Sequence, residues 1–292
     1  MKLDGEGYYH VVSRIVNREY RMDAKEKDIF VGMMRRAQKF SGVDVLTFAV
    51  LDNHFHILVR VPEREEVGEE TLLERIGALY GETKAATLRA RWEALRDDGD
   101  DESVAAEQAA YAKRMYDVSE FVKTLKMRYS ISYNARTHRE GTLWEGRFKS
   151  VLVDPNSVAM RNTATYIELN AVRAKIVSDP SKYRWCGYGE ACRGVADAVA
   201  GIGKLLPPSA TPRPAADVLR EYASRFGGQT PGPVAFPVRV NRLTKGLALG
   251  GRKYVDEVAR NTGFAGGKPA YVPCPGEKGD VYALRGPRRV TA

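Results

Sequence analysis

The spacing of apolar residues divides the first sixty positions into strands and one helix. Residues 8–16 (YYHVVSRIV), 43–50 and 54–61 (HFHILVRV) are rich in β-branched and aromatic residues, which is typical of strands. Between the first two segments, Asp23 caps a helical pattern that ends near Gly42. An Asp-Asn turn separates the second strand from the third. This order predicts an α+β fold, a ferredoxin-like sandwich with a central antiparallel sheet.

The next hundred residues continue this pattern around an insertion. Residues 63–112 are predicted to be a charged helical insertion in which 97–102 form a solvated loop. Ser119 is predicted to cap a helix that runs to about Asn134, and 141–153 to form a turn and a strand. A last helix is expected from Asn156 or Ser157 to about Lys175.

Changes in composition suggest three parts. Residues 1–190, with 63–112 inserted, are predicted to be one domain. Gly and Pro then become frequent, so 191–237 are predicted to be a linker with one short helix near 216–226. Residues 238–292 hold 11 basic and 4 acidic residues and are predicted to form a small basic C-terminal module with a helix near 253–260.

The composition excludes several classes of protein. Of 292 residues, 43% are hydrophobic and 28% charged, which are proportions of a globular chain rather than a disordered one. No apolar run approaches the roughly 20 residues that cross a bilayer, and the first residues carry no apolar signal-peptide core. The three cysteines include no CxxC pair, which argues against a disulfide framework. We therefore expect a soluble protein of a reducing compartment.

Charge is strongly segregated along the chain. The insertion holds 14 acidic and 6 basic residues, a local charge of −8. Because the whole chain carries +9, the other 242 residues carry +17. Such an excess suits a polyanionic partner, although a basic surface without any such partner accounts for it equally well.

His54 and His56 form the sharpest local motif. Residues two apart on a strand face the same side, so the two imidazoles lie next to each other and are able to bind one metal ion. No Cys and no other His lies close by in sequence, which argues against a structural zinc site. A mixed nitrogen and oxygen site would suit Mg²⁺ or Mn²⁺ in phosphate chemistry. The alternative is a pair of hydrogen-bonded histidines without a metal.

The predicted helix 157–175 carries a second candidate set. Tyr166, Asn170 and Arg173 fall at i, i+4 and i+7, away from an apolar stripe that suits the core. A phenol, an amide oxygen and a guanidinium in one row can act as nucleophile, metal ligand and phosphate clamp. The alternative is a half-buried tyrosine with polar neighbours.

Residues 119–150 combine seven basic residues and three acidic ones with aromatic side chains, including Tyr129, Tyr133 and Trp144. Cations interleaved with rings suit single-stranded nucleic acid, because every exposed base offers a face for stacking. The alternative is that the rings are core residues and the cations form a solvated rim.

These segments, taken in order, resemble a known family. YYHVVSRIVNREY, VLTFAVLDNHFHILV, RYSISYNARTHREGTLWEGRFKS and TYIELNAVRAKIVSDPSKYRW are similar to segments of the single-tyrosine HUH transposases. Among these the similarity is to the branch of REP-associated tyrosine transposases. It covers about residues 5–188, with 63–112 as an insertion.

The resemblance implies a function and a set of roles. It implies cleavage and rejoining of single-stranded DNA beside REP-like hairpins through a 5′-phosphotyrosine, with Mg²⁺ or Mn²⁺ as cofactor. His54 and His56 match the metal-binding pair, Tyr166 the nucleophile and Asn170 the residue that completes the metal site. Many relatives have proline where this chain has Ala171, so we expect the helix to continue there without a kink. The candidate DNA-binding residues are Arg14, Lys123, Lys126, Arg128, Arg136, Arg139, Trp144, Arg147, Lys149 and Arg173.

The resemblance further implies a bacterial, cytoplasmic and nucleoid-associated protein, monomeric or homodimeric, with no membrane partner. Three alternatives remain open. Tyr129 and Tyr133 are also four residues apart on a helix, the spacing of two-tyrosine replication initiators. The second alternative is that the chain is a protein derived from a transposase that binds a DNA hairpin or RNA without cleaving it. The acidic insertion is a further candidate, as a docking surface for a protein partner.

Overall fold

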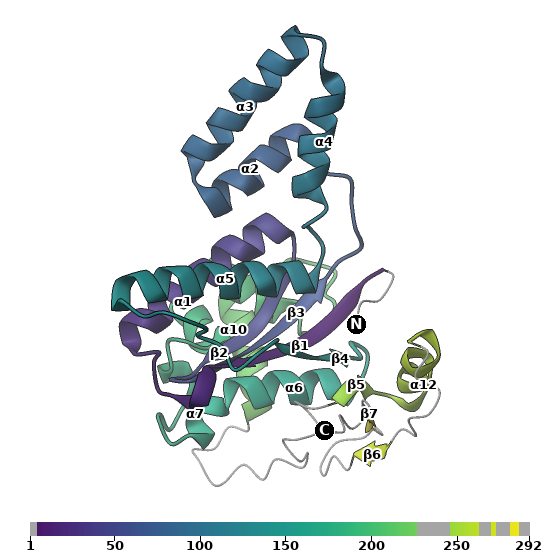
Figure 1. Ribbon diagram of the computed structural model, residues 1–292. Coiled ribbons are helices and arrows are strands. Elements are labelled where there is room, and N and C mark those ends of the chain that lie inside the picture. Colours follow the sequence, from purple (N-terminus) through teal and green to yellow (C-terminus); the bar gives the residue numbers. More distant parts are fainter. Residues whose placement is uncertain (1–4, 227–245, 263–269, 273–280, 286–292) are drawn as a thin grey trace, which may run out of the picture.

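The computed structural model describes residues 5–226, 246–262, 270–272 and 281–285. Within these ranges one seven-stranded sheet has the order β2-β3-β1-β4-β5-β7-β6 (Figure 1). No helix in the same ranges is both long and apolar enough to cross a bilayer. The strands are β1 (Gly7–Arg14), β2 (Asp44–Val50), β3 (His54–Val61), β4 (Lys149–Val153), β5 (Gly246–Gly250), β6 (Ala270–Val272) and β7 (Val281–Arg285).

The first four strands and two helices form the predicted ferredoxin-like sandwich. β1 lies between β3 and β4 and is antiparallel to both, while β2 pairs with the outer side of β3. α1 (Ala24–Ser41) leads from β1 to β2, and α5 (Val118–Thr137) leads to β4. Both helices cover the same face of the sheet, as Figure 1 shows. The predicted α+β class with a central antiparallel sheet is therefore confirmed.

Both ends of α1 follow from the sequence as predicted. The Asp23 carboxylate accepts a hydrogen bond from the Glu26 backbone amide at 2.8 Å, which caps the first turn. Gly42 ends the helix in the left-handed region, with φ of 67°. A Cβ at Gly42 would also lie 2.8 Å from the Tyr116 ring, so glycine is required there on two counts.

Helix α5 begins earlier than predicted, and strand β4 begins later. Asp117, not Ser119, caps α5, because its carboxylate accepts from the backbone amides of Ser119 and Glu120. The helix also runs beyond Asn134 to Thr137. The strand predicted within 141–153 is limited to the last five of these residues.

The insertion is helical, as predicted, and has its own small core. It consists of α2 (Glu69–Tyr80), α3 (Glu82–Asp97) and α4 (Asp101–Ala112), which project beyond the sandwich in Figure 1. Buried Leu72, Ile76 and Trp92 are among the apolar side chains that hold these helices together. The acidic loop is shorter than predicted, since Asp100 caps α4 through the Ser103 backbone amide.

Packed helices lie within residues 191–226, the described part of the predicted 191–237 linker. Residues after β4 form α6 (Val158–Glu168), α7 (Asn170–Arg173), α8 (Gly187–Ala191), α9 (Ala196–Gly203) and α10 (Ala215–Ala223), with 3-10 turns η2 (Pro180–Lys182) and η3 (Ser224–Phe226). Buried Ile202 and Tyr222 pack α9 and α10 into the second core of the sheet. A Cβ at Gly201 would lie 2.3 Å from the Val45 carbonyl oxygen. This glycine therefore allows α9 to pack closely against β2, and it does not mark a flexible linker.

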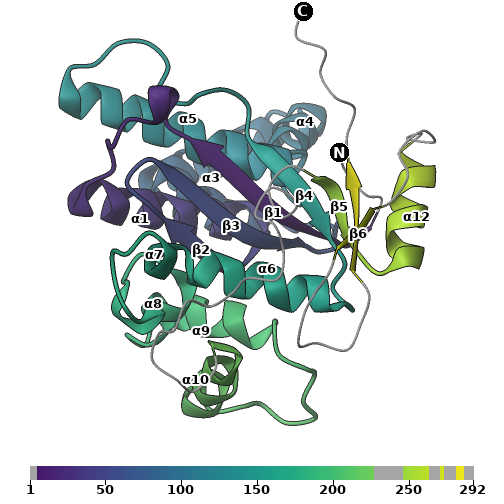
Figure 2. The ribbon, with the colours of Figure 1, turned by 90° about the horizontal axis from the view of Figure 1, so that it is seen from below.

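The described part of 238–292 extends the same sheet. β5 pairs with β4 in parallel, β7 with β5 and β6 with β7, and α12 (Arg252–Asn261) lies beside them in Figure 2. The Asp154 carboxylate accepts from the Gly251 backbone amide at 3.0 Å and links the end of β4 to the start of α12. This segment is therefore an extension of the sandwich, and the helix predicted at 253–260 is present.

Candidate active site

The register of β1 and β3 gathers polar side chains on one face of the sheet. In this pairing Arg14 lies opposite His54, and Val12 lies opposite His56. Directly paired residues face the same side, so Arg14 lies on the face of His54 and His56. His10 lies two residues before Val12, which faces this side as well, so His10 is on the same face. α1 and α5 cover the other face, so the histidines face α6 (Figure 2).

Helix α6 places Tyr166 beside the histidines. Ser157 caps the helix through the Ala159 backbone amide, and Met160, Ala164 and Ile167 bury its apolar stripe against the sheet. The Tyr166 ring centroid lies 5.5 Å from that of His56, with the two planes at 89°. Only 3% of Tyr166 is exposed. Residues more than a hundred positions apart in the chain therefore meet in one cluster.

The two histidines of β3 both engage their Nδ1 atoms. His54 Nδ1 lies 2.7 Å from Oδ1 of Asn53, whose Nδ2 donates to the Arg18 carbonyl at 2.9 Å. Because this second bond orients the amide, Oδ1 faces His54 as an acceptor, and His54 Nδ1 must be the donor. His56 Nδ1 lies 2.9 Å from Nε2 of His10. In this arrangement Nε2 is the ring nitrogen of both His54 and His56 that is left for a further ligand.

Burial keeps both imidazoles neutral. It lowers the pKa of His54 to about 4, with a further contribution from the Arg14 guanidinium that Asp52 partly opposes. The pKa of His56 is lowered well below its usual value, first by burial and then by the neighbouring imidazoles of His10 and His54. Neutral imidazole is the form that binds a metal ion, so the electrostatics of this face suit a cation.

The helix that carries Tyr166 is interrupted at Leu169, so the predicted helix does not run unbroken through Ala171. α6 ends at Glu168 and α7 begins at Asn170, although no proline is present. The Asn170 side-chain Nδ2 donates to the Tyr166 carbonyl oxygen at 3.0 Å. In an unbroken helix the backbone amide of residue 170 would bond to this carbonyl, so a side-chain bond takes its place at the break. The same bond holds Asn170 next to the candidate nucleophile.

Two opposing effects act on the Tyr166 phenol. Burial raises its pKa above the ordinary value of 10.0, whereas the Arg173 guanidinium and hydrogen bonding by Asn170 and Arg173 lower it. The centre of the Arg173 guanidinium lies 5.1 Å from the Tyr166 ring centroid. At neutral pH the phenol is therefore protonated, and Arg173 is the residue placed to stabilise its anion.

Glu168 is a functional candidate that the sequence pattern did not reveal. It is fully buried two residues after Tyr166 and accepts hydrogen bonds from the Thr47 hydroxyl and, at 3.0 Å, from the Tyr188 backbone amide. These bonds tie α6 to β2 on one side and to α8 on the other. Burial raises the pKa of this carboxyl to about 7. Glu168 thus anchors the helix that carries the candidate nucleophile.

The raised pKa of Glu168 predicts a pH-dependent stability. A carboxyl with a pKa near 4.5 when unfolded and about 7 when folded stabilises the protein fully below pH 4.5 and loses that contribution as pH rises to 7. The loss is on the order of 3 kcal/mol. We expect urea denaturation to show that wild type loses this much relative to Glu168→Gln between pH 4.5 and 7.5. Parallel pH profiles for the two proteins would contradict the prediction.

Only part of the predicted DNA-binding set lies near this cluster. Arg14 and Arg173 act electrostatically on Tyr166, and exposed Lys149 pairs with Val12 and so faces the same side as His56. α5 covers the opposite face of the sheet, so the predicted basic residues on this helix lie away from the histidines. The predicted residues on α5 and in the segment that follows it are Lys123, Lys126, Arg128, Arg136, Arg139, Trp144 and Arg147.

Two members of that set have structural roles. Trp144 is only 7% exposed, and its Nε1 donates to Ser130 Oγ at 2.8 Å, so its ring packs in the core and is not open for base stacking. Arg136 forms an ion pair with Glu26 at 2.6 Å. Trp144 is therefore a core ring, as the alternative states, whereas Arg136 is held by an ion pair and is not part of a solvated rim.

The rival tyrosines are also core residues. Tyr129 is fully buried and Tyr133 is 5% exposed, both in the cluster beneath α1 and α5. The Tyr129 hydroxyl donates to Glu26 Oε2 at 3.1 Å, and burial raises its pKa. Because both lie on the face opposite His54 and His56, they do not share a site with the histidine pair.

His54, His56 and Asn170 are the residues of this cluster whose donor atoms would suit a divalent cation. Within the described ranges, no group of three His, Cys, Asp or Glu side chains is arranged to hold a metal. The neutral His54 and His56 would supply Nε2 atoms, and Asn170, whose Nδ2 is already used, would supply Oδ1. Two nitrogens, one oxygen and water are acceptable to Mn²⁺ or Mg²⁺.

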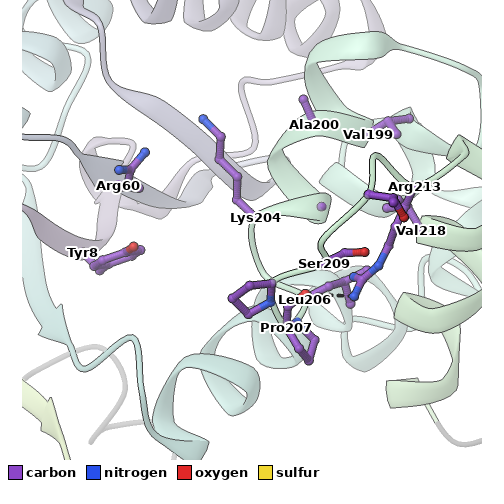
Figure 3. Close-up of a pocket in the computed structure, with 13 residues that line it drawn as sticks. Tyr8, Arg60, Val199, Ala200, Lys204, Leu206, Pro207, Ser209, Arg213 and Val218 are labelled. Carbon is purple, nitrogen blue, oxygen red and sulfur yellow. Dashed lines mark hydrogen bonds between the residues drawn. The ribbon is translucent and has the colours of Figure 1, made fainter.

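A cavity on the same face of the sheet is a weaker candidate. It has a volume of about 480 Å³ and is lined in part by Tyr8, Arg60 and Lys204 (Figure 3). Arg60 is six residues beyond His54 on β3, which is roughly 20 Å along a strand. Asp44 forms ion pairs with both Arg60 and Lys204, at 3.0 and 2.6 Å. The cations are therefore compensated, and the cavity is separate from the histidine cluster.

Comparisons with known proteins include a similar solved structure. A scan against models of protein families gives no match, and a search of curated proteins gives none either. A solved structure, "Structure of the REP associates tyrosine transposase bound to a REP hairpin", is similar with a TM-score of 0.43 and 13% sequence identity. The match covers 74% of this chain and 93% of that chain.

Proposed function

We propose that this chain is a metal-dependent tyrosine transposase that nicks and rejoins single-stranded DNA next to hairpins. The observation that carries the proposal is the position of the Tyr166 ring, 5.5 Å from His56, on the sheet face that His56 shares with His54. A phenol beside a neutral imidazole pair combines a nucleophile with ligands for a divalent cation. The substrate class comes from the motifs that resemble the transposases.

The proposed reaction is an exchange of one phosphoester for another. The Tyr166 oxygen attacks phosphorus, a 5′-phosphotyrosine bond forms, and the bond to the 3′ oxygen breaks. The phenol gives up its proton and the leaving 3′ oxygen gains one, so the step needs no other reactant. A bound Mg²⁺ or Mn²⁺ would supply charge stabilisation at the phosphate and at the leaving oxygen. Rejoining is the reverse attack by a 3′-hydroxyl and needs no ATP.

The chain's own cations assist this step in two ways. Arg173 stabilises the phenolate of Tyr166, because it lowers the pKa that burial raises. Arg14 and Lys149 flank the histidines on the same face, where they can pair with phosphates on either side of the cleaved bond. Lys123, which is exposed on α5, can hold a more distant part of the DNA.

One observation favours a second function. Tyr166 is only 3% exposed, so DNA reaches its hydroxyl only if neighbouring side chains move. A protein in which they do not move would bind a DNA hairpin or RNA on its basic surface without cutting it. The four residues His54, His56, Tyr166 and Asn170 favour the enzyme, because binding alone does not require them together.

A single assay separates the two functions. The full chain is incubated with Mn²⁺ and single-stranded DNA that carries a hairpin and different labels at its 3′ and 5′ ends, which report the covalent fragment and the released fragment respectively, and the products are resolved on a denaturing gel. The enzyme predicts a labelled band that migrates with the protein and a free 3′-hydroxyl fragment. A mobility shift on a native gel without any covalent band would support the binding protein and overturn the transposase.

Arg173 provides a graded test of the proposed chemistry. We expect Arg173→Ala to reduce single-turnover cleavage at pH 8 by about tenfold or more and to shift the pH profile upward, because the Tyr166 phenolate loses its neighbouring cation. Arg173→Lys should recover part of the rate. Lys175→Ala removes an exposed cation nearby and should have little effect. Equal pH profiles for Arg173→Ala and wild type would contradict this role.

A further inference from the structure

His10 is a third imidazole in the cluster, and it comes from β1 and not from the His54–His56 motif. It lies in the middle of β1, is completely buried, and has Leu58 and Val151 as its cross-strand neighbours. An apolar residue would fill this place if packing alone were needed, because a buried polar group requires a partner. His10 contacts His56: its Nε2 lies 2.9 Å from His56 Nδ1, and the two rings stack with centroids 5.1 Å apart.

The contact between the two rings contains one shared proton. When one nitrogen of this pair donates, the other must accept, so His56 carries its hydrogen either on Nδ1 or on Nε2. If Nδ1 carries it, His56 donates to His10, and Nε2 keeps a free lone pair. If Nε2 carries it, His56 accepts from His10 and is not a metal ligand. The tautomer of His56 therefore decides whether the site can form.

The neighbouring histidine shows which tautomer matches the site. His54 Nδ1 donates to Asn53 Oδ1, as the Arg18 contact of the same amide requires, so His54 Nε2 is unprotonated. For two histidines on one strand face to bind one cation, His56 must also have an unprotonated Nε2. His10 then accepts the Nδ1 proton of His56, just as Asn53 accepts the Nδ1 proton of His54.

We propose that His10 is a positioning residue that accepts the Nδ1 proton of His56, and so fixes the tautomer and the ring orientation that let His54 and His56 bind one divalent cation together. The proposal rests on the metal site of the proposed function. Outer partners of this kind typically change metal affinity ten- to hundredfold. His10 touches no substrate in this account and acts only through His56.

Two substitutions at one position isolate the hydrogen bond from the packing. His10→Gln places an amide oxygen near the position of Nε2 and is able to accept, whereas His10→Leu fills similar space and is not. His138→Gln is the matched control, since His138 is exposed at the end of α5 and is one of only four histidines in the chain. All three variants are checked for folding by circular dichroism.

The first measurement needs no metal. Long-range ¹H–¹⁵N spectra of the histidine side chains, recorded in EDTA, report which ring nitrogen carries hydrogen. We expect the Nδ1–H form for His56 in wild type and in His10→Gln, and a mixture of forms in His10→Leu. A wild-type spectrum with His56 in the Nε2–H form would overturn the proposal, even if neither variant folds.

The second measurement is the affinity for Mn²⁺ by calorimetry, without DNA. We expect His10→Leu to weaken binding ten- to hundredfold, and His10→Gln and His138→Gln to stay within about threefold of wild type. If wild type binds Mn²⁺ and His10→Leu binds equally well, the role of His10 is wrong and the metal site stands. If wild type itself binds no Mn²⁺, the metal site of the proposed function fails, and the tautomer measurement still decides what His10 does.

Discussion

Replacement of Tyr166 with phenylalanine should abolish the covalent adduct with hairpin-bearing DNA. The Tyr166→Phe ring retains the packing of Tyr166 against His56 and the α6 core, so the protein should stay folded and still bind DNA. It lacks the oxygen that forms the phosphotyrosine bond. We expect the cleavage rate to fall on the order of 10⁴-fold or more, to the level without a nucleophile. Denaturing gels measure the adduct, and fluorescence anisotropy measures binding.

The same change at the rival tyrosines is the matched control. Tyr129→Phe and Tyr133→Phe should keep forming the adduct at close to the wild-type rate, because both rings lie on the other face of the sheet. Tyr129→Phe also loses its bond to Glu26, which should cost about 1 kcal/mol of stability. An adduct that persists in Tyr166→Phe and disappears in one of these controls would transfer the nucleophile to that tyrosine.

Loss of the histidine pair should have the second largest effect. We expect His54→Gln and His56→Gln each to reduce cleavage on the order of 10³-fold or more, to the rate of wild type in EDTA. Both changes remove a nitrogen ligand, and added Mn²⁺ should restore the chelated wild type but not the variants. Because chelation and mutation remove the same contribution, their effects should not add.

DNA binding and folding separate this effect from general damage. Binding to the hairpin should stay within about threefold of wild type, since phosphate contacts depend on cations elsewhere on the surface. His138→Gln should cleave normally. Full cleavage by wild type in EDTA, or additive losses from EDTA and His56→Gln, would show that the imidazoles act in some way other than as metal ligands.

The sequence was sufficient to predict the core of the fold. Runs of β-branched and aromatic residues predicted β1, β2 and β3, and the alternation of side chains along a strand placed His54 and His56 on one face. The capping residues Asp23 and Gly42 predicted both ends of α1. These features are local, because they depend on residues a few positions apart.

Features set by contacts distant in the sequence were not predictable in the same way. Gly201 resembled a linker residue, yet it allows α9 to approach the Val45 carbonyl. Trp144 resembled a residue for base stacking, yet its Nε1 donates to Ser130 Oγ and its ring is buried in the core. Glu168 was assigned no role from the sequence, and its anchoring role appears only when Thr47 and Tyr188 are brought to it.

In the candidate site too, features that depend on nearby residues were predictable and features that depend on distant contacts were not. Spacing alone indicated that Tyr166, Asn170 and Arg173 share a helix, but it predicted neither the break at Leu169 nor the Asn170 bond to the Tyr166 carbonyl. His10 had no spacing relation to the HxH pair, because the pairing register of β1 with β3 brings it there. Reasoning from spacing therefore finds residues on one element and misses those contributed by its neighbours.

The central claim is that Tyr166 is the residue that becomes joined to DNA. The most direct measurement is mass spectrometry of the adduct formed by the wild-type chain with hairpin-bearing single-stranded DNA and Mn²⁺, after protease and nuclease digestion. We predict a phosphonucleotide mass on Tyr166 alone, in the peptide that contains TYIELN. The same mass on Tyr129, Tyr133 or any other residue, with Tyr166 unmodified, would contradict the account.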